Sequence, residues 1–166
     1  MKKKGLSDVI STVLLITLTV VLIGVVWVIV GGIVKDKTIA GTSCLDLFEK
    51  VKLNEEFTCY DAGTNTLRVS VDITDLDVDG ILFSVSDLIK SKSFEIKKEP
   101  SNVDGVSAYD SSPEVSLPNA NDGKDYLVSL SFFGITNPTS VKIAPKINGN
   151  QCEVSDSLDE LKLCRS

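Results

Sequence analysis

The strongest constraint on this chain is an uncharged run of 26 residues near its N-terminus, from residue 9 to residue 34. As an α-helix rising about 1.5 Å per residue, this run would be roughly 39 Å long, more than the roughly 30 Å hydrocarbon thickness of a bilayer. A lone strand in lipid would leave its backbone N–H and C=O groups unpaired, so a helix is predicted despite the many Val and Ile residues. Lys2, Lys3 and Lys4 predict a cytoplasmic N-terminus, with everything after residue 34 outside the membrane.

Two ordinary classes of N-terminal segment also fit a long apolar run. A secretory signal peptide has an apolar region of about 7–15 residues that ends at a small-x-small cleavage site. This run is nearly twice as long, and Lys35, Asp36 and Lys37 follow it. A plain single-span anchor matches the length, but it leaves the order of the residues in front of the run unexplained.

The residues in front of the run are Lys3-Lys4-Gly5-Leu6-Ser7. This order resembles the leader of archaeal type IV pilins and their relatives, the archaellins, in which a basic stub ending in Gly precedes an apolar residue and a Ser. The resemblance implies that a prepilin peptidase cuts between Gly5 and Leu6 and leaves the apolar helix attached. It covers residues 1–34, although many relatives have Pro where this chain has Asp8.

The resemblance also implies how the helix is used. The helix would first lie in membrane lipid and would then be bundled with copies of itself by a pilus assembly platform. Ser7 and Ser11 are small residues four apart, suited to close helix packing. Asp8 is expected either to pair with the new α-amino group of Leu6, in the same or a neighbouring subunit, or to cap the helix at the membrane surface. Gly24, with the glycines at 31 and 32, predicts either a packing position or a loosened helix end.

The 132 residues after residue 34 are enough for one domain with its own core. They carry 14 basic and 22 acidic residues, a formal charge of about −8. This charge argues against binding nucleic acid through its phosphates. The chain contains no histidine, which excludes histidine-based triads and histidine metal sites.

All four cysteines lie in this outer part, and an even number in an exported segment predicts disulfides. They are Cys44, Cys59, Cys152 and Cys164, and none forms a Cys-x-x-Cys pair. Four cysteines allow three pairings. The pairs Cys44–Cys59 and Cys152–Cys164 are favoured because each brackets a short segment, and a 15-residue loop closed in this way contributes about 3 kcal/mol.

Short segments with apolar–polar alternation predict an α+β chain in which the long N-terminal helix precedes an outer antiparallel β-sandwich. The expected layout is a leader at 1–5, a helix at 6–34, a polar linker at 35–43 and a β domain at 44–166. A turn is expected at 62–65, a loop at 101–121, and a helical turn at 157–163 from the capping-box spacing of Ser157 and Glu160. Strands are expected at 45–53, 57–60, 67–73, 81–85, 94–96, 126–133 and 141–147.

The sharpest local motif is Asp75-Leu76-Asp77-Val78-Asp79-Gly80, which matches the opening D-x-D-x-D-G of a calcium loop. Ser86 stands where that loop needs a bidentate Glu, so a solvated acidic turn is the competing interpretation. No other cofactor is predicted, and no catalytic motif is found, so an enzyme is not expected.

These features favour a structural subunit of an archaeal type IV pilus-like surface filament that serves adhesion or display. The subunit would be stored in the cell membrane before it enters the extracellular filament. The alternative is a single-span surface protein whose β domain binds a ligand or calcium.

Overall fold

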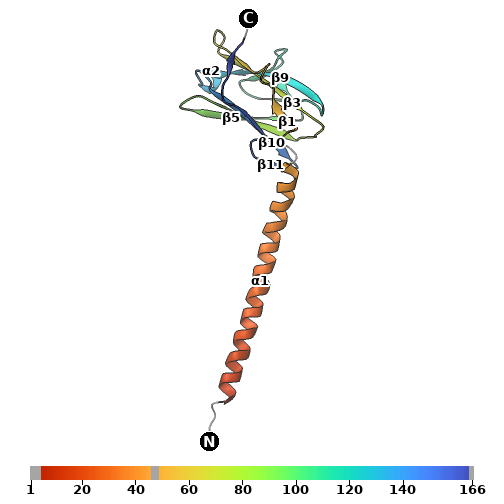
Figure 1. Cartoon of the computed structure of the whole chain (residues 1–166), viewed down its shortest axis with the longest axis vertical. Helices are drawn as coiled ribbons and strands as arrows, with labels where there is room; N and C mark the ends of the chain where they lie inside the picture. The colour runs from red at the N-terminus through yellow and green to blue at the C-terminus, as the bar shows by residue number, and fades with distance from the viewer. Residues whose placement is uncertain (1–4, 46–48, 165–166) are drawn as a thin grey trace. The chain divides into compact units, whose positions relative to one another are not determined.

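The computed structural model describes the backbone of residues 5–45 and 49–164, and the side chains of residues 9–31, 44 and 49–164. The chain divides into two compact units, Met1–Ala40 and Gly41–Ser166. A long N-terminal apolar helix precedes a β-rich domain whose strands are mostly antiparallel, as the sequence predicted (Figure 1).

The N-terminal helix α1 is continuous from Gly5 to Leu45, 41 residues in all (Figure 1). At about 1.5 Å per residue it is roughly 60 Å long. The predicted helix end at residue 34 is therefore wrong, because the segment 35–43, expected to be a linker, is helical. Leu45 is also helical rather than the first residue of a strand, and residues 46–48 of that predicted strand lie outside the described residues.

The β domain contains thirteen described strands and one short helix. Their bounds are β1 Val51–Leu53, β2 Cys59–Asp61, β3 Thr66–Ile73, β4 Gly80–Ser86, β5 Ser91–Lys97, β6 Ser101–Asn102, β7 Val106–Ala108, β8 Glu114–Val115, β9 Asp122–Ser129, α2 Leu130–Phe133, β10 Ser140–Ile147, β11 Asn150–Gln151, β12 Asp156–Leu158 and β13 Lys162–Leu163.

The strands form two larger sheets and one small one. The six-stranded sheet has the order β13-β2-β3-β9-β7, and β1 also pairs with β3. The five-stranded sheet has the order β11-β10-β4-β5, and β12 also pairs with β10. The strands β6 and β8 pair only with each other in the small sheet. Every described pairing is antiparallel except that of β13 with β2, which is parallel.

The alternation of apolar residues decides which face of each strand is buried. Along β3, the side chains of Leu67, Val69, Val71 and Ile73 are buried, as the period-two pattern predicted. The core also joins the two larger sheets. Phe83 of β4 stacks on Phe94 of β5, with ring centroids 5.3 Å apart, and it meets Tyr126 of β9 edge-on at 5.8 Å.

Three local predictions in the β domain are wrong. The loop expected at 101–121 contains three short strands, and the strand expected at 126–133 ends at Ser129, where α2 begins. The helical turn expected from Ser157 to Leu163 is instead β12, an irregular segment and β13. The reason is long-range pairing: β12 is hydrogen-bonded to β10, and Asp156 accepts a hydrogen bond from the backbone N–H of Leu53 at 2.9 Å.

Candidate assembly helix and disulfide frame

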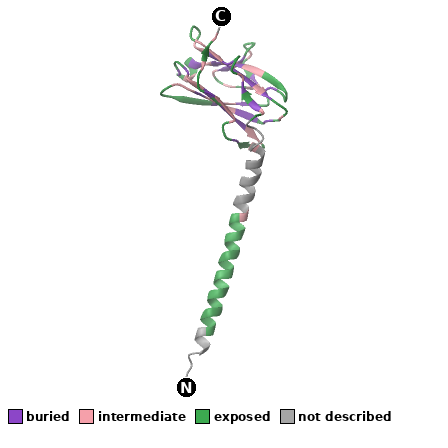
Figure 2. Cartoon of the chain, viewed as in Figure 1, coloured by how far each residue is buried: buried purple, intermediate pink, exposed green. Residues whose placement is uncertain are grey.

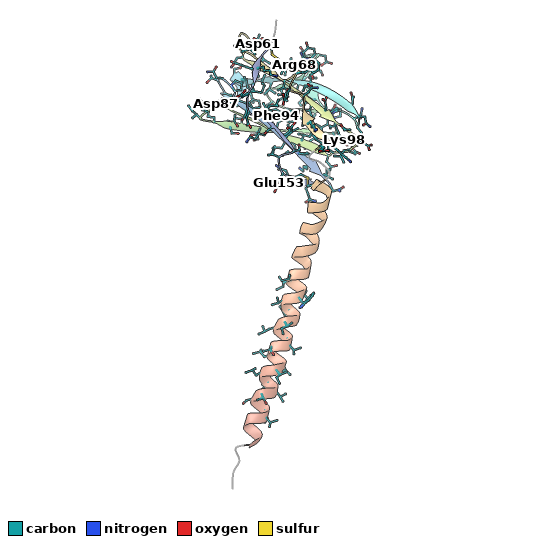
Figure 3. The ribbon with its side chains drawn as sticks, in the orientation of Figure 1. Asp61, Arg68, Asp87, Phe94, Lys98 and Glu153 are labelled. Carbon is teal, nitrogen blue, oxygen red and sulfur yellow. A yellow bond between two sulfur atoms is a disulfide. The ribbon has the colours of Figure 1, made fainter. Side chains whose placement is uncertain are left out.

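Helix α1 exposes an apolar surface all around its axis. Every residue from 9 to 30 is exposed, while the buried residues lie in the β domain (Figure 2). Side chains project from both sides of the helix in Figure 3, and Leu15 and Val28 are 65% and 78% exposed. A helix that is apolar on every side belongs in a large core or in a membrane. Because no described residue of the chain covers it, something outside the chain must.

The segment Val9–Gly31 is long and apolar enough to cross a membrane, and none of it is buried within the chain. Its 23 residues span about 35 Å as a helix, slightly more than the hydrocarbon core of a bilayer. Length and composition of this kind are shared by membrane anchors and N-terminal signal sequences.

The few polar side chains in this segment are satisfied by the helix itself. The hydroxyl of Thr12 donates to the carbonyl of Val9 at 2.9 Å, and that of Thr19 donates to the carbonyl of Ile16 at 2.8 Å. The hydroxyl of Thr17 likewise reaches carbonyls one turn back. Threonines bonded in this way present methyl groups outward, so they lower the cost of placing the helix in an apolar environment.

Gly24 and Gly31 leave small gaps in the otherwise bulky surface of α1. A Cβ atom added at either position would meet no other atom within 4 Å. The two residues are seven apart, which is nearly two helical turns, so they lie on almost the same side. Small residues placed in this way let a second helix approach closely.

The predicted cleavage site lies at the start of α1. The helix begins at Gly5, so the Gly5–Leu6 peptide bond is in its first turn. Ser11 is exposed, one turn above the end of the predicted motif. The side chains of Ser7 and Asp8 lie outside the described residues, and their predicted assembly roles stay predictions.

All four predicted disulfide cysteines are bonded, but the favoured pairing is wrong. The bridges join Cys44 to Cys152 and Cys59 to Cys164, with Cα–Cα distances of 5.5 and 4.9 Å. Parallel pairing of β13 with β2 places the C-terminal end of the chain beside Cys59. The first bridge ties the last turn of α1 to the segment between β11 and β12. Disulfides of this kind are typical of a domain outside the cytoplasm.

The acidic motif at residues 75–80 does not form the predicted calcium loop. Both carboxylate oxygens of Asp77 accept hydrogen bonds from the Lys98 ammonium at 2.7 Å. Asp79 accepts from the backbone N–H of Gly149, and Asp75 donates its own N–H to Asn121. Among the described residues no group of three acidic, Cys or His side chains is placed to hold a metal ion. The motif connects β3 to β4 as an acidic turn.

A cluster around Arg68 was missed by sequence reasoning. Its guanidinium pairs with the carboxylate of Asp125 and lies against the ring of Tyr109, 4.2 Å from the ring centroid, and near that of Phe57 at 5.9 Å. The only sequence signal was a charged residue at an outward position of β3. The partners are distant in sequence, so no local pattern connects them.

Comparison with known proteins adds no family assignment. No family of known proteins, no curated protein and no solved structure matches the chain.

Proposed function

We propose that the chain is a structural subunit of an archaeal type IV pilus-like surface filament, used for adhesion or display. The uncovered apolar surface of α1, attached to a disulfide-bonded β domain, is the observation that carries this proposal. Each large apolar side chain left in water costs about 1.5–3 kcal/mol relative to burial, so residues 9–30 require a cover worth tens of kcal/mol.

Two covers follow one another in this proposal. Membrane lipid surrounds α1 before assembly, with the N-terminus in the cytoplasm and the β domain outside. Copies of the same helix replace the lipid when the assembly platform adds the subunit to the filament. The self-satisfied threonines suit both environments, and Gly24 and Gly31 supply positions for close helix contact.

The leader distinguishes this proposal from a plain anchor. Prepilin peptidase cuts after Gly5, and Leu6 becomes the N-terminus of the mature subunit. Asp8 is then the third residue, where an unpaired carboxylate in a dry bundle costs several kcal/mol and an α-amino group is the nearest cation. The proposal also takes the β domain to be a β-sandwich, which is supported by the contact of Phe83 in one larger sheet with Tyr126 in the other.

The experiment that tests the proposal is N-terminal sequencing and intact-mass analysis of the chain extracted from the surface of producing cells. The mature protein is expected to begin at Leu6, and Gly5→Val is expected to retain the leader. Gly31→Val is the matched control, because an added side chain there meets nothing in the chain and the peptidase site is untouched. An intact Met1 would identify a plain anchor, and a start near Ala40 would identify a signal peptide.

A further inference from the structure

The outward face of the six-stranded sheet carries one continuous row of side chains. Arg68 alternates along β3 with the buried Leu67 and Val69, so its row points away from the core. Neighbouring strands are about 4.8 Å apart, so five strands give a row roughly 19 Å long. Directly paired residues make up this row, which consists of Lys162, Cys59, Arg68, Leu127 and Ser107.

Two exposed aromatic rings flank the middle of this row. Phe57 is 48% exposed and Tyr109 is 57% exposed. Their ring centroids lie 5.9 and 4.2 Å from the central carbon of the Arg68 guanidinium, so the two rings are at most about 10 Å apart. Large apolar rings held in water at a fixed spacing are suited to contact with a ligand.

The polar centre of the row offers hydrogen bonds without net charge. Nε and Nη2 of Arg68 both donate to Oδ2 of Asp125. Within the described residues, Nη1 of Arg68 and Oδ1 of Asp125 make no hydrogen bond, and the two side chains are 28% and 21% exposed. One donor and one acceptor therefore remain between the two rings, and the paired charges cancel.

The surface is hollowed on both sides of the ring pair. A groove of about 670 Å³ beside Phe57 is lined by Glu56, Thr58, Arg68, Lys162 and Leu163, among others. A second hollow of about 370 Å³ lies along β7 and β9 and includes Ser107, Leu127 and Ser129. Figure 3 shows Arg68 on the β domain, well separated from the tip of the β4–β5 hairpin at Asp87.

We propose that this face binds a neutral saccharide chain. The C–H faces of pyranose rings would stack on Phe57 and Tyr109, because polarised C–H groups are attracted to the negative face of an aromatic ring. The sugar hydroxyls would bond to the free donor of Arg68 and the free acceptor of Asp125. The spacing of the two rings matches a short run of linked pyranoses.

Other classes of ligand fit this face less well. A polyanion would meet a guanidinium that is already neutralised, on a chain of net charge −6. A wholly apolar partner would bury the polar atoms of Arg68 and Asp125 without hydrogen bonds, which costs free energy. A saccharide supplies apolar faces and hydroxyls in alternation, as this row does. Binding here does not depend on whether the chain forms filaments.

The test is calorimetric titration of the full chain in detergent micelles with two neutral probes, cellohexaose and chitohexaose, at concentrations up to about 5 mM. Saturable binding of at least one probe is expected. Phe57→Ala and Tyr109→Ala should each weaken it by roughly fivefold or more, whereas Tyr109→Phe, which keeps the ring, should change it by less than about twofold.

Leu88→Ala is the control variant, because Leu88 is 91% exposed and adjoins Asp87 at the distant hairpin tip. Its affinity should equal that of the wild type. The proposal is overturned if neither probe binds, or if binding survives the combined Phe57→Ala and Tyr109→Ala changes in a chain whose circular dichroism is unaltered. Absence of sugar binding together with a change in self-association in Tyr109→Ala would mark the face as a protein interface instead.

Discussion

Removing the bridge between Cys59 and Cys164 by changing both residues to serine is expected to cost a calculable part of the stability of the β domain. The two disulfides cross in the sequence, because Cys59 lies inside the loop closed by Cys44 and Cys152. There are 15 residues from Cys44 to Cys59 and 12 from Cys152 to Cys164. With one bridge present, the other therefore closes a loop of about 27 residues rather than more than 100.

In the chain-entropy treatment, a 27-residue loop contributes about 3.5 kcal/mol to the free energy of unfolding. Removing either bridge alone should therefore cost about the same amount. Removing both should cost about 8 kcal/mol, because the last remaining bridge closes a loop of more than 100 residues, worth about 4.7 kcal/mol. The two single losses do not add up to the double loss, since each bridge shortens the loop that the other closes.

The assay is thermal unfolding of the full chain in detergent micelles, followed by circular dichroism in the β-sheet region. A loss of about 3.5 kcal/mol in a domain of this size should lower the Tm by roughly 10–15 °C. Serine substitution of the Cys44–Cys152 pair is the matched comparison and should give a similar shift. A loss below about 1 kcal/mol for either pair, or recovery of a linked Cys44–Cys59 fragment on non-reducing peptide mapping, would refute the reasoning.

Three further predictions concern the core, the helix and the acid response. Phe83→Ala should destabilise the β domain by about 3–5 kcal/mol in denaturant unfolding, since Phe83 is fully buried between two aromatic rings. Gly24→Leu should leave insertion and cleavage unchanged but lower filament yield, measured by shearing and sedimentation. The backbone N–H groups of Ile89 and Lys90 hold the pKa of Asp87 below its ordinary value of 3.8, so its stabilising contribution is complete above that value and is lost as the pH falls through the lowered pKa. A carboxyl-carbon NMR titration should place its midpoint below 3.8.

Each of these predictions has a control and a contradicting result. Phe132→Ala removes a ring that is 60% exposed, so it should cost clearly less than Phe83→Ala, and equal costs would contradict the assignment of the core. Val21→Leu should leave filament yield unchanged, and a wild-type yield from Gly24→Leu would remove the packing role of that glycine. A midpoint for Asp87 at or above 3.8 would show that its turn is not formed in solution.

The features that the sequence predicted correctly depend on local patterns. The uncharged run from residue 9 to residue 34 predicted the long helix, and the alternation from Leu67 to Ile73 predicted β3 and its buried face. Both patterns act through neighbours a few residues apart, which is the range over which helix and strand periodicity can be read.

The features that the sequence did not predict depend on distant partners. Each disulfide joins residues more than 100 apart, and short loops were preferred over the parallel pairing of β13 with β2 that brings Cys164 to Cys59. The capping-box spacing of Ser157 is a local signal that pairing with β10 overrides. The aromatic face around Arg68 is assembled from segments that only the sheet brings together.

The most direct test of the central proposal is electron cryomicroscopy of filaments sheared from cells that produce the chain. The account predicts filaments whose core is a bundle of helices that fits residues 6–45 without lipid between them, with β domains on the outside. Finding the chain only in the membrane fraction, or finding filaments that contain none of it, would contradict the account.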